Sequence, residues 1–307
     1  MRYQSYKFQV PEEKIVRLIT DTDAKNEADD DFAIVQALLS PKIENVGLIG
    51  AHYGTRDPNG MEKSVAELET VVDKMGFTGS IPILHGASHA MDNRTASVES
   101  EGAHFIIQEA MRDDERPLYA IFLGPLTDLA SAYLMEPRIA KRMTVIWIGG
   151  GAYPNGGDEF NLGNDISAAN IVLSSEIELW QVPKNVYEMM PVSFAELEYR
   201  VRPCGKIGRY LCEQLMEHAM TEQPKKSSFR SGESWVLGDS PAVGLIIYED
   251  RFSFQWVQAP TIGTDMNYIH TNRYRPIRVY EKIDSRLILE DLYSKLALFS
   301  RLKEHDL

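Results

Sequence analysis

The sequence predicts an α/β fold in which a Rossmann-like, mainly parallel central sheet is flanked by helices within a single domain, residues 1–307. Two observations support this prediction. Short, nearly continuous apolar runs recur along the chain, as is typical of parallel strands covered on both faces. Segments with helical periodicity lie between these runs, and a parallel sheet needs such crossovers to connect its strands.

The expected elements follow from these patterns in chain order. Four apolar runs predict strands at residues 15–19, 46–49, 119–123 and 145–148. Apolar periodicity with plausible helix ends predicts helices at residues 30–39, 61–75, 102–111, 126–135 and 166–174. The polar stretch 200–233 predicts a helix followed by a flexible loop at 225–232. The leucines of residues 283–300 fall mostly on one side, which predicts a last amphipathic helix.

Composition narrows the class of protein. Apolar residues make up 44% and charged residues 25% of the chain, as in ordinary globular proteins, and no apolar run reaches the roughly 18 residues of a membrane span. The net charge of −13, without a segregated basic patch, argues against a nucleic-acid partner. Two cysteines are too few for a disulfide framework, and residues 1–10 lack the apolar core of a signal peptide, so a cytoplasmic location is expected.

The most informative segment is acidic and follows the first predicted strand. Six of the eleven residues from Asp21 to Asp31 carry carboxylates. The carboxyl ends of strands in α/β sheets bind ligands, and crowding carboxylates there costs several kcal/mol (order of magnitude) unless a cation compensates. Ca²⁺ and Mg²⁺ take such oxygen ligands. Alternatively, Asp29–Asp31 open a predicted helix, where carboxylates interact favourably with the positive end of the helix dipole. This alternative does not explain Asp21 and Asp23 at the tip of the strand, so a metal site is favoured.

Five motifs, including this acidic segment, follow one another along the chain. The first is the Asp-x-Asp of residues 21–23 followed by the Asp pair before the helix. The others are Leu-Gly-Pro-Leu-Thr-Asp at 123–128, Ile-Gly-Gly-Gly at 148–151, Glu-Phe-Asn at 159–161 with Asp165 and Ala168-Ala169, and Gly-Asp-Ser-Pro at 238–241. In this order the five motifs resemble those of the nucleoside hydrolases of the inosine-uridine-preferring type, and the similarity spans about residues 15–300.

This resemblance implies Ca²⁺-dependent hydrolysis of the N-glycosidic bond of a ribonucleoside or related riboside, in purine or pyrimidine salvage, by a homodimer or homotetramer. It implies that the metal ligands are Asp23, Asp30 and Asp239 with the main-chain carbonyl of Leu123, and that Asp23 is also the general base on a calcium-bound water. It implies ribose-hydroxyl contacts from Asp29, Glu159 and Asn161. Each has a structural alternative: Asp239 as a helix cap, Asn161 as a turn residue, and Glu159 as a solvated loop carboxylate.

The chain departs from the family pattern at three places. Its acidic loop is two residues longer and lacks glycine, which predicts that Asn26 contacts the substrate and brings Glu27 near the site. Thr55 stands where the family has asparagine. Gly238 replaces the histidine that helps protonate the leaving purine, so we expect Trp235 to stack on the base and consider Arg230 or Glu233 as leaving-group assistants.

Two other functions remain open at this stage. Asp21-Thr22-Asp23 at a strand end also resembles the motif of Mg²⁺-dependent phosphatases with an aspartyl nucleophile, although no phosphate-binding lysine can be placed. The chain could also be a non-catalytic protein that binds a riboside at the metal site without cleaving it. Gly238, which replaces the family's histidine, favours this alternative.

Overall fold

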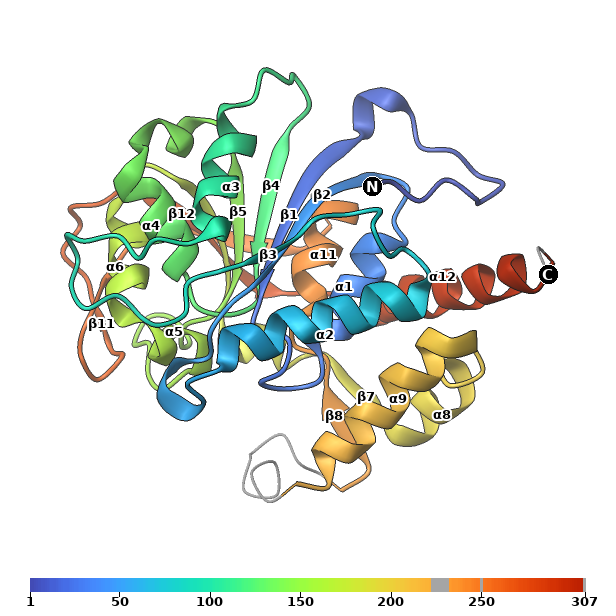
Figure 1. Ribbon diagram of the computed structural model, residues 1–307. Coiled ribbons are helices and arrows are strands. Elements are labelled where there is room, and N and C mark those ends of the chain that lie inside the picture. Colours follow the sequence, from blue (N-terminus) through green and yellow to red (C-terminus); the bar gives the residue numbers. More distant parts are fainter. Residues whose placement is uncertain (222–231, 249–250, 306–307) are drawn as a thin grey trace.

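An eight-stranded sheet forms the centre of the molecule in the computed structural model, which describes residues 1–221, 232–248 and 251–305 (Figure 1). Neighbouring strands run parallel throughout, except that the edge strand β9 is antiparallel to β12. In order across the sheet, the strands are β3 (Ile83–His85), β2 (Ile43–Gly50), β1 (Val16–Thr22), β4 (Leu118–Phe122), β5 (Thr144–Ile148), β6 (Glu178–Val182), β12 (Pro276–Lys282) and β9 (Ser253–Gln258). The predicted fold class is confirmed.

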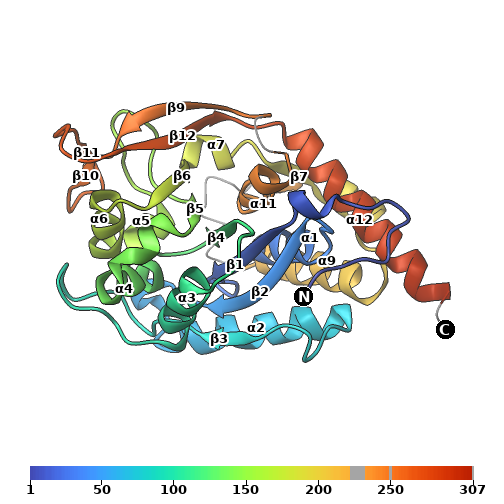
Figure 2. The ribbon, with the colours of Figure 1, turned by 90° about the horizontal axis from the view of Figure 1, so that it is seen from above.

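Helices cover both faces of this sheet (Figure 2). One face carries α1 (Asp30–Leu38), α11 (Ser240–Ile247) and α12 (Ser285–His305), and the other carries α3 (Glu101–Met111), α4 (Thr127–Met135) and α6 (Ile166–Ser174). Successive strand residues alternate between the two cores: Leu18 packs in the first and Ile19 in the second. This double coverage explains why the central strands have nearly continuous apolar sequences.

The remaining elements lie around the sheet. Helix α2 (Gly60–Met75) packs along β2 and β3, and α9 (Gly205–Ala219) packs on α2. The other elements are α5 (Phe160–Asn164), α7 (Lys184–Tyr187), α8 (Phe194–Arg200), the pairs β7 (Pro191–Ser193) with β8 (Ser234–Val236) and β10 (Thr261–Ile262) with β11 (Tyr268–Ile269), and the short helices η1 (Glu12–Lys14), η2 (Gly54–Arg56) and η3 (Pro137–Lys141).

The four predicted strands and five predicted central helices are confirmed, the helices to within a residue at each end. The amphipathic C-terminal segment forms α12, and the stretch 200–233 contains α9; the predicted flexible loop at 225–232 lies, apart from Gly232, outside the described residues. None of the helices in the described ranges is long and apolar enough to cross a membrane.

The strand order fixes where a ligand can bind. After β1 the chain builds β2 and β3 on one side of the sheet and then returns to add β4 on the other side of β1. This reversal makes the carboxyl ends of β1 and β4 a topological switch point, where loops diverge to opposite faces and leave a crevice. The acidic segment after β1 begins at this point.

Candidate active site

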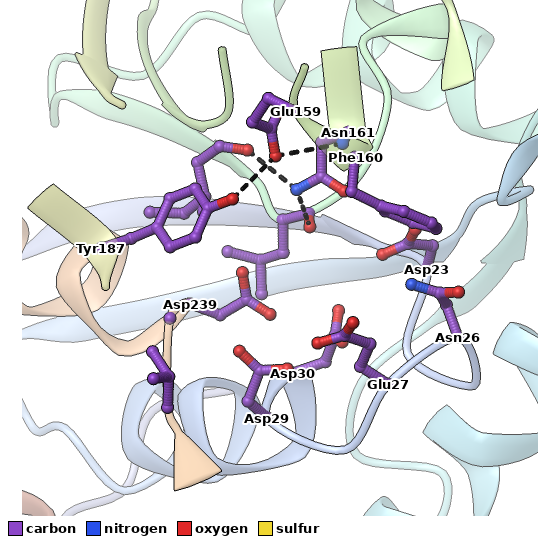
Figure 3. Close-up of a pocket in the computed structure, with 14 residues that line it drawn as sticks. Asp23, Asn26, Glu27, Asp29, Asp30, Glu159, Phe160, Asn161, Tyr187 and Asp239 are labelled. Atoms are coloured by element: carbon purple, nitrogen blue, oxygen red, sulfur yellow. Dashed lines mark hydrogen bonds between the residues drawn. The ribbon is translucent and has the colours of Figure 1, made fainter. Parts of the chain in front are cut away.

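A pocket lies at the switch point, and most of the predicted site residues line it (Figure 3). The loop after β1 and the start of α1 form one wall, the ends of β4 and β5 form the floor, and the turn into α5 and the turn into α11 close the sides. We call this the main pocket; its lining residues are Asp23, Asn26, Glu27, Asp29, Asp30, Leu123, Ile148, Glu159, Phe160, Asn161, Tyr187, Val236, Gly238 and Asp239.

Three buried carboxylates meet at the centre of the main pocket. Asp29, Asp30 and Asp239 each offer an oxygen within 4.8 Å of the other two, and sequence positions about 200 residues apart thus form one cluster. Burial raises the pKa of Asp29 to about 6 and that of Asp30 to about 7, although main-chain hydrogen bonds from Gly238 and Asp239 favour the charged form of Asp29. Such crowding is unfavourable for carboxylates without a positive partner.

Asp23 faces the same space from the tip of β1 (Figure 3). The side chain is 2% exposed, and its Oδ2 has no hydrogen-bond partner among the described residues. Gly124 lies directly behind it: a Cβ at that position would be 3.0 Å from Asp23 Cγ, so glycine allows the turn after β4 to approach Asp23. Burial, followed by Asp30 and Glu27, raises the pKa of Asp23 well above its usual range. A buried carboxylate oxygen without a donor fits a cation ligand.

Glu159 and Asn161 are held rigidly at the start of α5. The Glu159 carboxylate accepts hydrogen bonds from the main-chain N–H groups of Gly150 (2.7 Å) and Leu162 (2.9 Å) and from the Tyr187 hydroxyl (3.0 Å). Asn161 donates from Nδ2 to two main-chain carbonyls, Leu123 at the end of β4 (2.8 Å) and Ile148 at the end of β5 (2.9 Å). These side chains are therefore preorganised beside the carboxylate cluster.

Trp235 does not line the main pocket, although the sequence predicts that it stacks on the base. Its ring is 2% exposed and packs edge-on against His218 with 5.4 Å between ring centroids. The next residue, Val236, lines the pocket instead, because neighbouring side chains of strand β8 point to opposite faces. Glu233 does not line the pocket either, and Arg230 lies outside the described residues.

The other predicted site residues are brought together. Asn26 and Glu27 enter the main pocket from the longer loop. Sequence reasoning missed Tyr187, which follows the unpredicted strand β6 in the four-residue helix α7 and has no local motif. Asp21 is fully buried and does not line the pocket, so it is not placed to act as the aspartyl nucleophile of a phosphatase.

Comparison with known proteins agrees with this architecture. The family model described as inosine-uridine preferring nucleoside hydrolase matches residues 18–289. The chain belongs to this family. As a nucleoside hydrolase it is an enzyme, an N-ribosyl hydrolase.

Individual relatives of this nucleoside hydrolase are distant. It is 25% identical over 268 residues to the pyrimidine-specific ribonucleoside hydrolase RihA of Salmonella paratyphi A, covering 80% of this chain and 81% of that protein. It is 25% identical to a probable uridine nucleosidase 2 of Arabidopsis thaliana, covering 65% and 68% of the two chains. Its fold is similar to that of a purine-preferring ribonucleoside hydrolase from Gardnerella vaginalis, with a TM-score of 0.76, 20% identity and coverage of 93% and 99%.

Proposed function

We propose that this nucleoside hydrolase cleaves the N-glycosidic bond of a ribonucleoside or related riboside with the help of Ca²⁺. The observation that carries the metal assignment is the unpartnered, buried Oδ2 of Asp23 beside the carboxylates of Asp30 and Asp239. With the carbonyl oxygen of Leu123, these groups form an all-oxygen donor set that suits a hard cation. When bound, the ion would neutralise the carboxylates and make an attacking water more acidic.

The residues of the chain divide the remaining work. Asp29, Glu159 and Asn161, with Asn26 at the rim, bind and orient the ribose hydroxyls through carboxylate and amide hydrogen bonds. Asp23 accepts a proton from the attacking water as the water oxygen bonds to C1′. The C1′–N bond breaks, its electron pair leaves with the base, and the base nitrogen finally takes up the proton. The surrounding carboxylates favour the positive charge that develops on the sugar.

The test is release of free ribose from a panel of purine and pyrimidine nucleosides. We expect Asp23→Asn to lower kcat by about 10²–10⁴-fold, the usual contribution of a general base, with an unchanged circular dichroism spectrum. The matched control is Asp113→Asn, an exposed carboxylate before β4 at the opposite end of the sheet. Near wild-type turnover in Asp23→Asn would contradict the role of Asp23, and full activity after exhaustive chelation would contradict the metal.

We further propose one domain over residues 1–307, a cytoplasmic homodimer or homotetramer, and a small riboside as the partner. Both cysteines are free and buried, which suits a reducing compartment. Trp256 is 57% exposed on the edge strand β9, and an uncovered edge of this kind favours association between copies. Sedimentation velocity of the purified chain tests the oligomer; a monomer at micromolar concentration would contradict it.

A further inference from the structure

The described lining of the main pocket has no cationic group that could stabilise the departing base. Its described lining residues are acidic, polar-neutral or apolar, and none of them is cationic or a histidine. The family's histidine position is occupied by Gly238, where a Cβ would lie 3.1 Å from the Tyr187 ring. Cleavage leaves an electron pair on the base, so a donor is needed near the base end of the substrate.

A second pocket adjoins the main pocket across Phe160. We call it the side pocket, and it shares Glu159 and Phe160 with the main pocket. Arg56 enters it from η2, directly after the loop that follows β2, on the same edge of the sheet as the site. The residues that line the side pocket include Arg56, His89, Asp158, Glu159, Phe160 and Asn164.

Arg56 is held in place by an aromatic ring and not by an ion pair. Its guanidinium carbon lies 3.7 Å from the centroid of the Phe160 ring, a cation–π arrangement. Within the described ranges, no hydrogen bond or ion pair occupies the guanidinium, so its N–H donors are available to a ligand. Burial lowers the pKa of Arg56, whereas the nearby carboxylates of Glu27, Asp23 and Asp158 raise it.

A second donor lies in the side pocket. Asn164 Nδ2 is buried and has no hydrogen-bond partner among the described residues. Gly54, with φ +75°, brings η2 close to this amide: a Cβ there would be 2.7 Å from Asn164 Oδ1. The exposed guanidinium of Arg56 and the unpartnered amide of Asn164 thus both line the side pocket. Two N–H donors in this arrangement suit a ligand with carbonyl or anionic oxygens.

We propose that Arg56 is a catalytic residue that donates hydrogen bonds to carbonyl oxygens of the departing base. The inference rests on the proposed function. As the C1′–N bond breaks, the electron pair delocalises from the base nitrogen onto these oxygens, and the guanidinium stabilises that charge until the nitrogen is protonated. Three carboxylates around Arg56 disfavour a ligand that is already a dianion, such as a 5′-phosphate, and favour a neutral group that becomes negative only during cleavage.

The test compares substrates that differ in how much help their leaving group needs. Uridine and inosine need stabilisation of the base, whereas 4-nitrophenyl β-D-ribofuranoside releases a stable phenolate. For Arg56→Gln we expect kcat on the nucleosides to fall by about 10²–10³-fold, as for loss of one transition-state donor, and kcat on the aryl riboside to fall less than about 3-fold. Arg56→Lys keeps the positive charge but not the planar, forked guanidinium. For this variant we expect a loss of kcat on the nucleosides that is smaller than the loss for Arg56→Gln.

The control is Arg138→Gln, which removes an exposed arginine paired with Glu136 and remote from both pockets. Equal losses on nucleosides and aryl riboside, or no loss on either, would overturn the role of Arg56 while leaving the hydrolase intact. A loss confined to uridine 5′-monophosphate would assign Arg56 to phosphate binding and overturn the proposal. Failure of the wild-type enzyme to cleave any riboside would instead refute the proposed function and this inference with it.

Discussion

Replacing Asp239 by asparagine separates the metal site from catalysis, because thermal stability reports the ion without any turnover. A chain of 307 residues unfolds with an entropy of about 0.6 kcal/mol per kelvin near 60 °C. Ca²⁺ at about 100 times its dissociation constant stabilises the native state by about 2.7 kcal/mol. We therefore expect Ca²⁺ to raise Tm of the wild type by about 4 °C relative to chelator.

The Asp239→Asn variant is expected to lose most of this Ca²⁺-dependent rise in Tm. Asp239 is buried within 4.8 Å of carboxylate oxygens on Asp29 and Asp30, so in chelator its charge costs stability, and a neutral amide relieves that cost. Asp239→Asn should then melt at or above the wild-type temperature in chelator and gain little from Ca²⁺. Differential scanning fluorimetry across a Ca²⁺ titration measures both the Tm in chelator and the rise in Tm with Ca²⁺, and Asp113→Asn serves as the control. An equal Ca²⁺ shift in Asp239→Asn and wild type would refute the assignment of Asp239.

Three further substitutions probe other parts of the site. Asn161→Ala leaves two buried main-chain carbonyls without a donor, so urea unfolding should show a loss of about 1–3 kcal/mol for each lost partner, together with a raised KM. Trp235→Phe keeps a buried ring against His218, so its KM should equal that of the wild type while Tm falls; a raised KM would place Trp235 in the substrate site after all. Gly124→Ala adds a Cβ 3.0 Å from Asp23 Cγ, so kcat should fall about 10-fold or more with little change in far-ultraviolet circular dichroism.

Local sequence was enough to predict one half of the sheet but not the other. Strands β1, β4 and β5 are covered on both faces, so their apolar runs stand out. Strands β6 and β12 carry polar residues between apolar ones, and β9 is largely exposed at the edge, so their patterns resemble loops or amphipathic segments. These strands acquire their identity by pairing with one another, and a single sequence does not show that pairing.

The same distinction applies to the site. Asp23, Asp29 and Asp30 lie within one short loop, where the accumulation of charge is visible without a fold. Asp239 required the resemblance to the family, because only the sheet topology brings it beside Asp30. The interpretation of Trp235 considered residue type alone, and the pleat of β8 turns that ring away from the pocket. Nothing in the local sequence distinguishes Arg56 from other surface arginines, because its contact with the Phe160 ring exists only in the folded chain.

The two pockets together separate charge in the direction that the reaction requires. Breaking a glycosidic bond makes the sugar positive and the base negative, so an efficient site needs anions at one end and a donor at the other. The described lining of the main pocket has carboxylates and no cation, and the side pocket adds Arg56 on the far side of the Phe160 ring. The guanidinium lies against the ring, and within the described residues it forms no ion pair with Asp23 or Glu27; a direct ion pair would neutralise both ends. A spacer role for the ring predicts that Phe160→Ala lowers kcat on uridine more than Phe160→Tyr does, because only the alanine lets Arg56 pair with the carboxylates. Equal effects of the two substitutions on kcat would contradict a spacer role for the ring.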